Sequence, residues 1–187
     1  MSVICVFGDS ITWGAWDFEL GGWVNRLRLY YDNQSGIEGE VYNLGVDGNY
    51  VGDVLKRFDV ETRARSPDII ILAIGINDSS HPSNPSGTDL EKFETQFNEL
   101  LEKARKFTGN IIVLGLTNVD EKSSDHGYIN SNIVLYNDKI KSIAKNQNLP
   151  FIDLFNTLAK NELEDGLHPN AKGHQKIFEK VKEVLTI

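Results

Sequence analysis

A serine follows the first apolar run of the chain almost at once. Ser10 lies in the stretch Gly8–Thr12, GDSIT. A glycine permits a tight turn between a strand and a helix, and a serine on such a turn can expose its hydroxyl as a nucleophile. The ordinary alternative is a helix cap, because aspartate and serine are common where helices begin. The stretch alone leaves both interpretations open.

A candidate base lies far along the chain, where Asp165 and His168 are three positions apart. In a turn, this spacing lets the carboxylate accept a hydrogen bond from the imidazole Nδ1, which leaves Nε2 to act as a base. Pro169 disfavours helix at His168 and can begin the helix that follows. The alternative is a loop aspartate beside a surface histidine. With Ser10, the pair would supply a hydroxyl, a base and an orienting acid.

Two further stretches, Asn43–Gly48 and Gly75–Asp78, offer hydrogen-bond donors. Gly45 can bring its backbone N–H close to a ligand, and the side-chain amide of Asn77 can donate to a developing oxyanion. Ordinary turns explain both stretches as well. A dinucleotide-binding loop is a third option for the first stretch, but the G-x-G-x-x-G spacing is absent.

The elements that must position these residues alternate along the chain. Short apolar runs rich in valine and isoleucine predict strands at 3–7, 40–44, 68–74, 110–116 and 149–154. Helical periodicity marks 23–30, 51–58, 90–104, 133–143 and 177–184, with Thr88 or Asp89 as N-cap of the third helix. This alternation predicts a three-layer α/β domain with a parallel sheet. Because ligands of such sheets bind beyond the carboxyl ends of the strands, the four stretches should meet at one edge.

Composition narrows the class of protein. The 187 residues suit one domain, 1–187, and the net charge of −8 argues against nucleic acid or anionic lipid as the main partner. No apolar run reaches the ~20 residues needed to span a membrane. A basic segment of the kind that opens a signal peptide is missing before Val3, so we expect a cytoplasmic location.

Cys5 is expected to be a buried, inert thiol. His174, six residues after His168, does not give a zinc-binding spacing, and we expect no metal.

Four stretches of the chain together resemble the sequence blocks of the SGNH (GDSL-type) esterase and lipase family: GDSIT, NLGVDG, GIND and DGLHPN, in that order. The resemblance implies a flavodoxin-like fold with a five-stranded parallel sheet flanked by helices, and a hydrolase that needs no cofactor. It also implies roles for single residues. Ser10 matches the nucleophile, His168 the general base and Asp165 its orienting partner. Gly45, Asn77 and the backbone N–H of Ser10 match the oxyanion hole.

The chain departs from the family pattern at two places. Ile11 stands where leucine is usual, and the second block lacks the hydroxyl residue often found after Gly48. The expected substrates are small or short-chain carboxylic esters, including O-acetyl groups on sugars. A lysophospholipase, a thioesterase and a non-catalytic binding module with the same fold remain alternatives. Trp13, Trp16 and Phe18 are candidate walls of a substrate pocket, with core or lid packing as the alternative.

Two long loops, at 79–88 and 118–128, are predicted to lie at the same edge of the sheet and to shape specificity. The sequence does not give the acyl chain length that is preferred. It also leaves the oligomeric state open, a homo-oligomer included.

Overall fold

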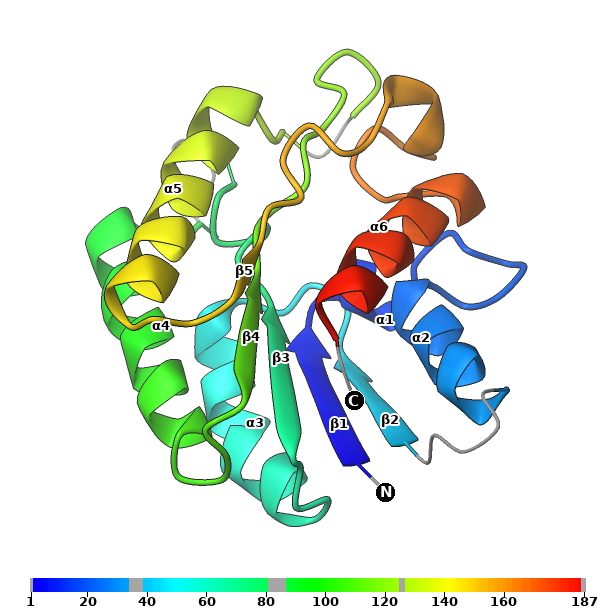
Figure 1. The fold of residues 1–187 in the computed structure, drawn as a ribbon. Helices are drawn as coiled ribbons and strands as arrows, with labels where there is room; N and C mark the ends of the chain where they lie inside the picture. Colours follow the sequence, from blue (N-terminus) through cyan, green and yellow to red (C-terminus); the bar gives the residue numbers. More distant parts are fainter. Residues whose placement is uncertain (1, 34–38, 81–86, 125–126, 186–187) are drawn as a thin grey trace.

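A parallel sheet forms the centre of the protein, whose computed structural model describes residues 2–33, 39–80, 87–124 and 127–185. Its strands are β1 (Ser2–Gly8), β2 (Gly39–Gly45), β3 (Ile69–Ala73), β4 (Ile111–Leu114) and β5 (Phe151–Ile152). Their order across the sheet is β2-β1-β3-β4-β5, and all neighbours are parallel (Figure 1). This order is typical of flavodoxin-like folds, so the predicted fold class is confirmed.

Helices cover both faces of the sheet (Figure 1). One face carries α2 (Trp23–Asp32) and α6 (Ala171–Val184), and the other carries α3 (Val51–Arg63), α4 (Leu90–Ala104) and α5 (Asn130–Asn146). Two short elements, α1 (Ser10–Trp13) and the 3-10 helix η1 (Lys160–Glu162), lie outside the sheet. All five helices predicted from periodicity are present. Asp89 caps α4 by accepting from the Lys92 N–H at 2.9 Å.

Strand β1 is buried on both faces because helices lie above and below it. Its residues Ile4 to Phe7 have no exposed surface, which explains the continuous apolar run in the sequence. The Phe7 ring packs on Phe58 of α3, with 4.6 Å between ring centroids. Cys5 is buried as predicted, and burial raises the pKa of its thiol to about 12. The nucleophile candidate therefore follows a strand whose last residues before the turn are fully buried.

Strands β4 and β5 are shorter than the sequence predicts. Strand β4 ends at Leu114 because a side chain of α5 replaces the next strand partner: the Leu116 N–H donates to Asn137 Oδ1 at 2.8 Å. Gly115 makes room for this contact, since a Cβ there would lie 2.6 Å from the same oxygen. Strand β5 begins only after Pro150, which has no N–H to donate.

The connections of the sheet create a switch point beside β1. The chain passes from β1 to β2 on one side and then crosses to β3 on the other side. Crossovers leave in opposite directions there, so the carboxyl ends of β1 and β3 are where a ligand of this fold type binds. Ser10 and Asn77 follow those two strand ends.

Candidate active site

The turn after β1 is both a helix cap and the support of the nucleophile candidate. Asp9 caps α1 by accepting from the Ile11 N–H at 3.0 Å, and Ser10 is the first helical residue. A Cβ on Gly8 would lie 2.0 Å from Thr12 Oγ1, so only glycine allows α1 to fold back this closely. As the first helical residue, Ser10 keeps a backbone N–H that no helical carbonyl can accept.

Ser10, His168 and Asp165 form a hydrogen-bonded chain. Ser10 Oγ lies 2.9 Å from His168 Nε2, and His168 Nδ1 lies 2.7 Å from Asp165 Oδ2. Because an ionised carboxylate can only accept, Nδ1 carries the ring proton and Nε2 accepts from the Ser10 hydroxyl. Burial alone would raise the pKa of Asp165, but hydrogen bonds from the His168 backbone and ring and from the Leu167 N–H outweigh it and lower that pKa. Asp165 is therefore ionised at neutral pH.

The loop that carries Asp165 and His168 is held on two sides. Leu163 and Pro169 form an antiparallel bridge, and the Glu164 N–H donates to the His168 carbonyl at 2.8 Å. Gly166 adopts a left-handed φ of +81°, and a Cβ there would lie 2.6 Å from the Ser124 nitrogen. The loop therefore packs directly against the segment that follows β4, and glycine is required at this contact.

The side-chain amide of Asn77 has a fixed orientation. Its Nδ2 donates to the Asn49 carbonyl at 2.9 Å, and its Oδ1 accepts from the Tyr128 hydroxyl at 2.8 Å. The Asn49 carbonyl can only accept, so the amide nitrogen must face it and the amide oxygen must face Tyr128. Among the residues that the structure describes, the second amide hydrogen has no acceptor. Asn77 thus has one donor left for a ligand.

Asn49 and Arg57 support that amide from behind. Arg57 Nε donates to Asn49 Oδ1 at 2.9 Å, and another guanidinium nitrogen donates to the Gly8 carbonyl at 3.2 Å. Asn49 follows Gly48, at the position where the family often has a hydroxyl residue. The contacts of this loop are therefore made by a backbone carbonyl and an amide. Sequence reasoning missed Asn49, Arg57 and Tyr128.

Gly45 lies against α1, but its N–H already has an acceptor. A Cβ on Gly45 would lie 2.2 Å from the Trp13 nitrogen, so the end of β2 approaches α1 closely. The Gly45 N–H donates to Asn43 Oδ1 at 2.9 Å, and Asn43 Nδ2 donates to the carbonyls of Thr12 and Trp13 at 2.9 and 3.2 Å. Serving an oxyanion would require the Gly45 N–H to turn from Asn43 to the ligand.

Three aromatic side chains lie on the surface beside the nucleophile turn. Trp13, Trp16 and Phe18 are 59, 44 and 86% exposed, which is unusual for large apolar residues. Trp16 and Phe18 meet edge to face with 5.9 Å between ring centroids. The Trp16 indole also donates to Asp165 Oδ2 at 3.0 Å, so this side chain contacts the hydrogen-bonded chain of Ser10, His168 and Asp165. Of the two loops expected to shape specificity, residues 81–86 and 125–126 lie outside the described part.

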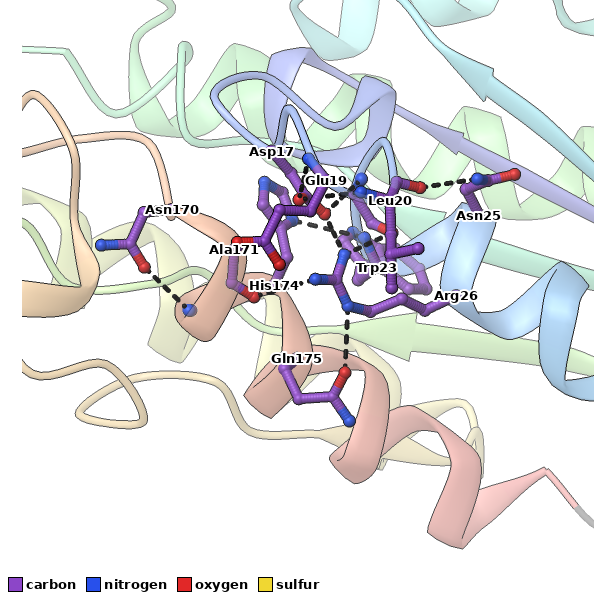
Figure 2. Close-up of polar contacts among 12 residues, drawn as sticks. Asp17, Glu19, Leu20, Trp23, Asn25, Arg26, Asn170, Ala171, His174 and Gln175 are labelled. Carbon is purple, nitrogen blue, oxygen red and sulfur yellow. Dashed lines mark hydrogen bonds and ion pairs between the residues drawn. The ribbon is translucent and has the colours of Figure 1, made fainter.

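His174 has a structural environment. It is fully buried, its Nε2 donates to the Ala15 carbonyl at 2.9 Å, and its Nδ1 accepts from the Trp23 N–H at 3.3 Å (Figure 2). Burial lowers its pKa, which keeps the ring neutral. Across the described ranges, no cluster of histidine, cysteine and carboxylate side chains is arranged to hold a metal ion.

Two carboxyl groups lie buried behind the site. Burial raises the pKa of Asp9 to about 7 and that of Asp78 to about 6. Asp78 Oδ2 accepts from the Val51 N–H at 3.1 Å, at the start of α3. Both groups resist ionisation at mildly acidic pH because they are removed from water.

A sequence comparison assigns most of the chain to one family. The profile of the GDSL-like Lipase/Acylhydrolase family matches residues 6–176. The chain is 29% identical over 163 residues to a multidomain esterase of Ruminococcus flavefaciens, covering 84% of this chain and 18% of that protein. It is 25% identical over 147 residues to an acetylxylan esterase of Geobacillus stearothermophilus, covering 72% of this chain and 66% of that protein. The chain therefore spans less than two thirds of either relative.

A structural comparison supports the same fold. The crystal structure of Axe2, an acetylxylan esterase from Geobacillus stearothermophilus, superposes with a TM-score of 0.81 at 22% identity, over 97% of this chain and 93% of that one. At this identity the likeness establishes the fold alone. In the part of the chain that the structure describes, no helix has the length and apolar character to cross a membrane.

Proposed function

The chain belongs to the GDSL-like lipase/acylhydrolase family, and we propose that it is a serine esterase that hydrolyses short-chain carboxylic esters, among them O-acetyl groups on sugars. One observation carries the proposal: the Ser10 hydroxyl is 2.9 Å from an imidazole nitrogen whose ring is oriented by Asp165. A serine in that arrangement is an activated nucleophile. The catalytic roles of Ser10, His168 and Asp165 are part of the proposal.

In the first step, Ser10 Oγ attacks the ester carbonyl while His168 Nε2 accepts the hydroxyl proton. The carbonyl π bond becomes the negative charge of a tetrahedral oxyanion. When the intermediate collapses, His168 donates its proton to the departing alcohol oxygen and an acyl-serine remains. Asp165 stays ionised throughout and stabilises the imidazolium, in agreement with its lowered pKa.

In the second step, water takes the place of the alcohol. His168 Nε2 accepts a proton from the water, whose oxygen attacks the acyl-serine carbonyl. Collapse of this second oxyanion releases the carboxylic acid and returns the proton to Ser10. The oxyanion is held by the spare amide hydrogen of Asn77, by the Ser10 N–H and by the Gly45 N–H once it leaves Asn43. One such donor typically contributes about 3 kcal/mol to lowering the barrier.

The substrate class rests on the surface beside the nucleophile and on the relatives. Trp13, Trp16 and Phe18 offer an exposed apolar wall, which suits an acyl group or the apolar face of a sugar ring. One relative is named an acetylxylan esterase, and catalytic mutants of Axe2 replace a serine and an aspartate–histidine pair three positions apart. Asp165 and His168 have the same spacing.

The test is hydrolysis by the wild type and by Ser10→Ala of p-nitrophenyl esters from acetyl to palmitoyl and of acetylated xylooligosaccharides. We expect turnover of the shortest esters and of the sugar esters, and its near-complete loss in Ser10→Ala. Ser142→Ala, on an exposed position of α5, is the matched control and should keep full activity. Wild-type rates in Ser10→Ala would exclude Ser10 as the nucleophile. A preference for palmitoyl would exclude the proposed substrate class.

A further inference from the structure

Trp16 contacts the triad carboxylate as well as the solvent. Asp165 Oδ2 accepts from two ring donors, His168 Nδ1 at 2.7 Å and Trp16 Nε1 at 3.0 Å. We propose that Trp16 is a positioning residue of the triad, whose indole N–H fixes the carboxylate of Asp165 in the orientation that serves His168. This inference rests on the proposed function, because it assigns Asp165 its role in the esterase triad.

The geometry at Asp165 shows what the indole adds. The other carboxylate oxygen, Oδ1, accepts from the backbone N–H groups of Leu167 and His168 at 3.0 and 2.8 Å. These two donors belong to the same short loop as Asp165, so they move with it. Trp16 belongs to the loop that follows the nucleophile, 149 positions away. Its N–H therefore ties the carboxylate to the part of the chain that carries Ser10.

The backbone at Trp16 is held in a conformation that a bulky residue rarely adopts. Its φ is +64°, in the left-handed region that glycine and asparagine favour. Such conformations persist where the surroundings impose them, and they are concentrated at functional sites. Here the unusual φ accompanies the indole contact to Asp165.

Both neighbours of Trp16 are fastened by buried polar contacts, and Figure 2 shows those of Asp17. On one side, the Ala15 carbonyl accepts from His174 Nε2 at 2.9 Å. On the other side, the buried Asp17 carboxylate pairs with Arg26. The same carboxylate accepts from three backbone N–H groups of its own loop, those of Glu19, Leu20 and Gly22. Trp16 therefore lies between two residues, Ala15 and Asp17, that are each held in place by polar contacts.

The same contacts fasten the loop to α6. Arg26 donates to the Ala171 carbonyl at 3.1 Å and to Gln175 Oε1 at 3.0 Å, and His174 belongs to the same helix (Figure 2). Helix α6 begins three residues after His168. The neighbours of Trp16 bind the first turns of α6, directly or through Arg26, and the loop that carries Asp165 and His168 leads directly into the same helix. The donor and the acceptor of the long-range hydrogen bond are therefore both fixed relative to α6.

The decisive variant is Trp16→Phe, which keeps an aromatic ring at the wall and removes the N–H donor. We expect kcat to fall about tenfold, the lower end of what a hydrogen bond to a charged group contributes, with KM changed less than about twofold. In an Asp165→Asn background the same substitution should have little further effect, because Trp16 acts through that carboxylate. Tyr42→Phe is the matched control, since it removes an aromatic donor from the carboxylate of Glu40 outside the site and should leave kcat unchanged.

A second readout needs no turnover. The hydrogen bond to the carboxylate should displace the Trp16 indole N–H resonance in NMR spectra and slow its exchange with solvent, so Asp165→Ala should move that resonance and speed its exchange. Tyr42→Phe should leave both unchanged. An indole resonance that is unmoved in Asp165→Ala, a rise in KM at constant kcat in Trp16→Phe, or a loss that multiplies fully with that of Asp165→Asn would overturn the inference. An inactive wild type with the expected NMR change would instead refute the proposed function and keep the contact.

Discussion

The most informative perturbation of the nucleophile turn is Asp9→Asn. Asp9 is buried, caps α1 through the Ile11 N–H, and has a pKa raised to about 7. The cause is burial, opposed in part by backbone hydrogen bonds and reinforced by the negative charge of Asp78. Asparagine is as good an N-cap as aspartate, so the substitution keeps the capping oxygen and removes only the ionisable group.

The size of the effect follows from the pKa difference. The unfolded chain loses the Asp9 proton near the ordinary value of 3.8, whereas the folded protein keeps it until about pH 7. Between these values the folded state binds more protons, so the stability of the wild type falls as pH rises. About 3 units at ~1.4 kcal/mol each give a loss of about 4 kcal/mol above pH 7. The free energy of unfolding of Asp9→Asn should not show this loss, because asparagine has no proton to release.

The assay is urea unfolding of the wild type and Asp9→Asn at several pH values from 4 to 8. The two free energies of unfolding should nearly coincide at the acid end and diverge in favour of Asp9→Asn toward pH 8. Asp138→Asn, on an exposed position of α5, controls for the general change in net charge. Stability curves of wild type and Asp9→Asn that run parallel over the whole range would refute the assignment of a raised pKa to Asp9.

Three further predictions concern the Asn77 amide of the proposed oxyanion hole, the close contact at Gly45 and the Cys5 thiol. Tyr128→Phe removes the donor that fixes the Asn77 amide, so kcat should fall about tenfold in the p-nitrophenyl acetate assay; an unchanged kcat would show that the amide needs no such support. Gly45→Ala places a Cβ 2.2 Å from a backbone nitrogen and should lower the free energy of unfolding in urea by at least about 2 kcal/mol, whereas Gly109→Ala, with open space around it, should stay within about 0.5 kcal/mol of the wild type; equal free energies of unfolding for the two variants would contradict the clash. Cys5, buried with a pKa of about 12, should react with a disulfide reagent only after unfolding, and rapid labelling of the native protein would contradict its burial.

The sheet and its helices could be predicted because their signals are local. The strand around Cys5 is a continuous apolar run with helices on both faces, and the helix around Phe97 repeats its apolar residues with the helical period. The family prediction is confirmed, since four short stretches in a fixed order carry it. Strand ends were less predictable. Leu116 leaves the strand because the side chain of Asn137, 21 positions away, accepts its N–H.

The polar contacts that support the site could not be read from the sequence because each joins distant segments. Tyr128 meets Asn77 across 51 positions, and Trp16 meets Asp165 across 149. The indole of Trp16 was predicted to form a pocket wall, with core or lid packing as the alternative, because no local sequence pattern indicates a left-handed tryptophan. The contact of Asn43 could have been predicted, because the amide oxygen of an asparagine two positions before a strand-end glycine can accept a hydrogen bond from the N–H of that glycine.

Ser10 and His168 are separated by 158 positions, yet they share one hydrogen bond. His168 leads into α6, which packs on α2 and on β5, the strand of two residues at the edge of the sheet. Edge elements with few partners tend to open before the core does. Ester turnover should therefore vanish while most of the backbone is still folded. Loss of the proposed esterase activity would then report a partial opening of the fold that precedes global unfolding.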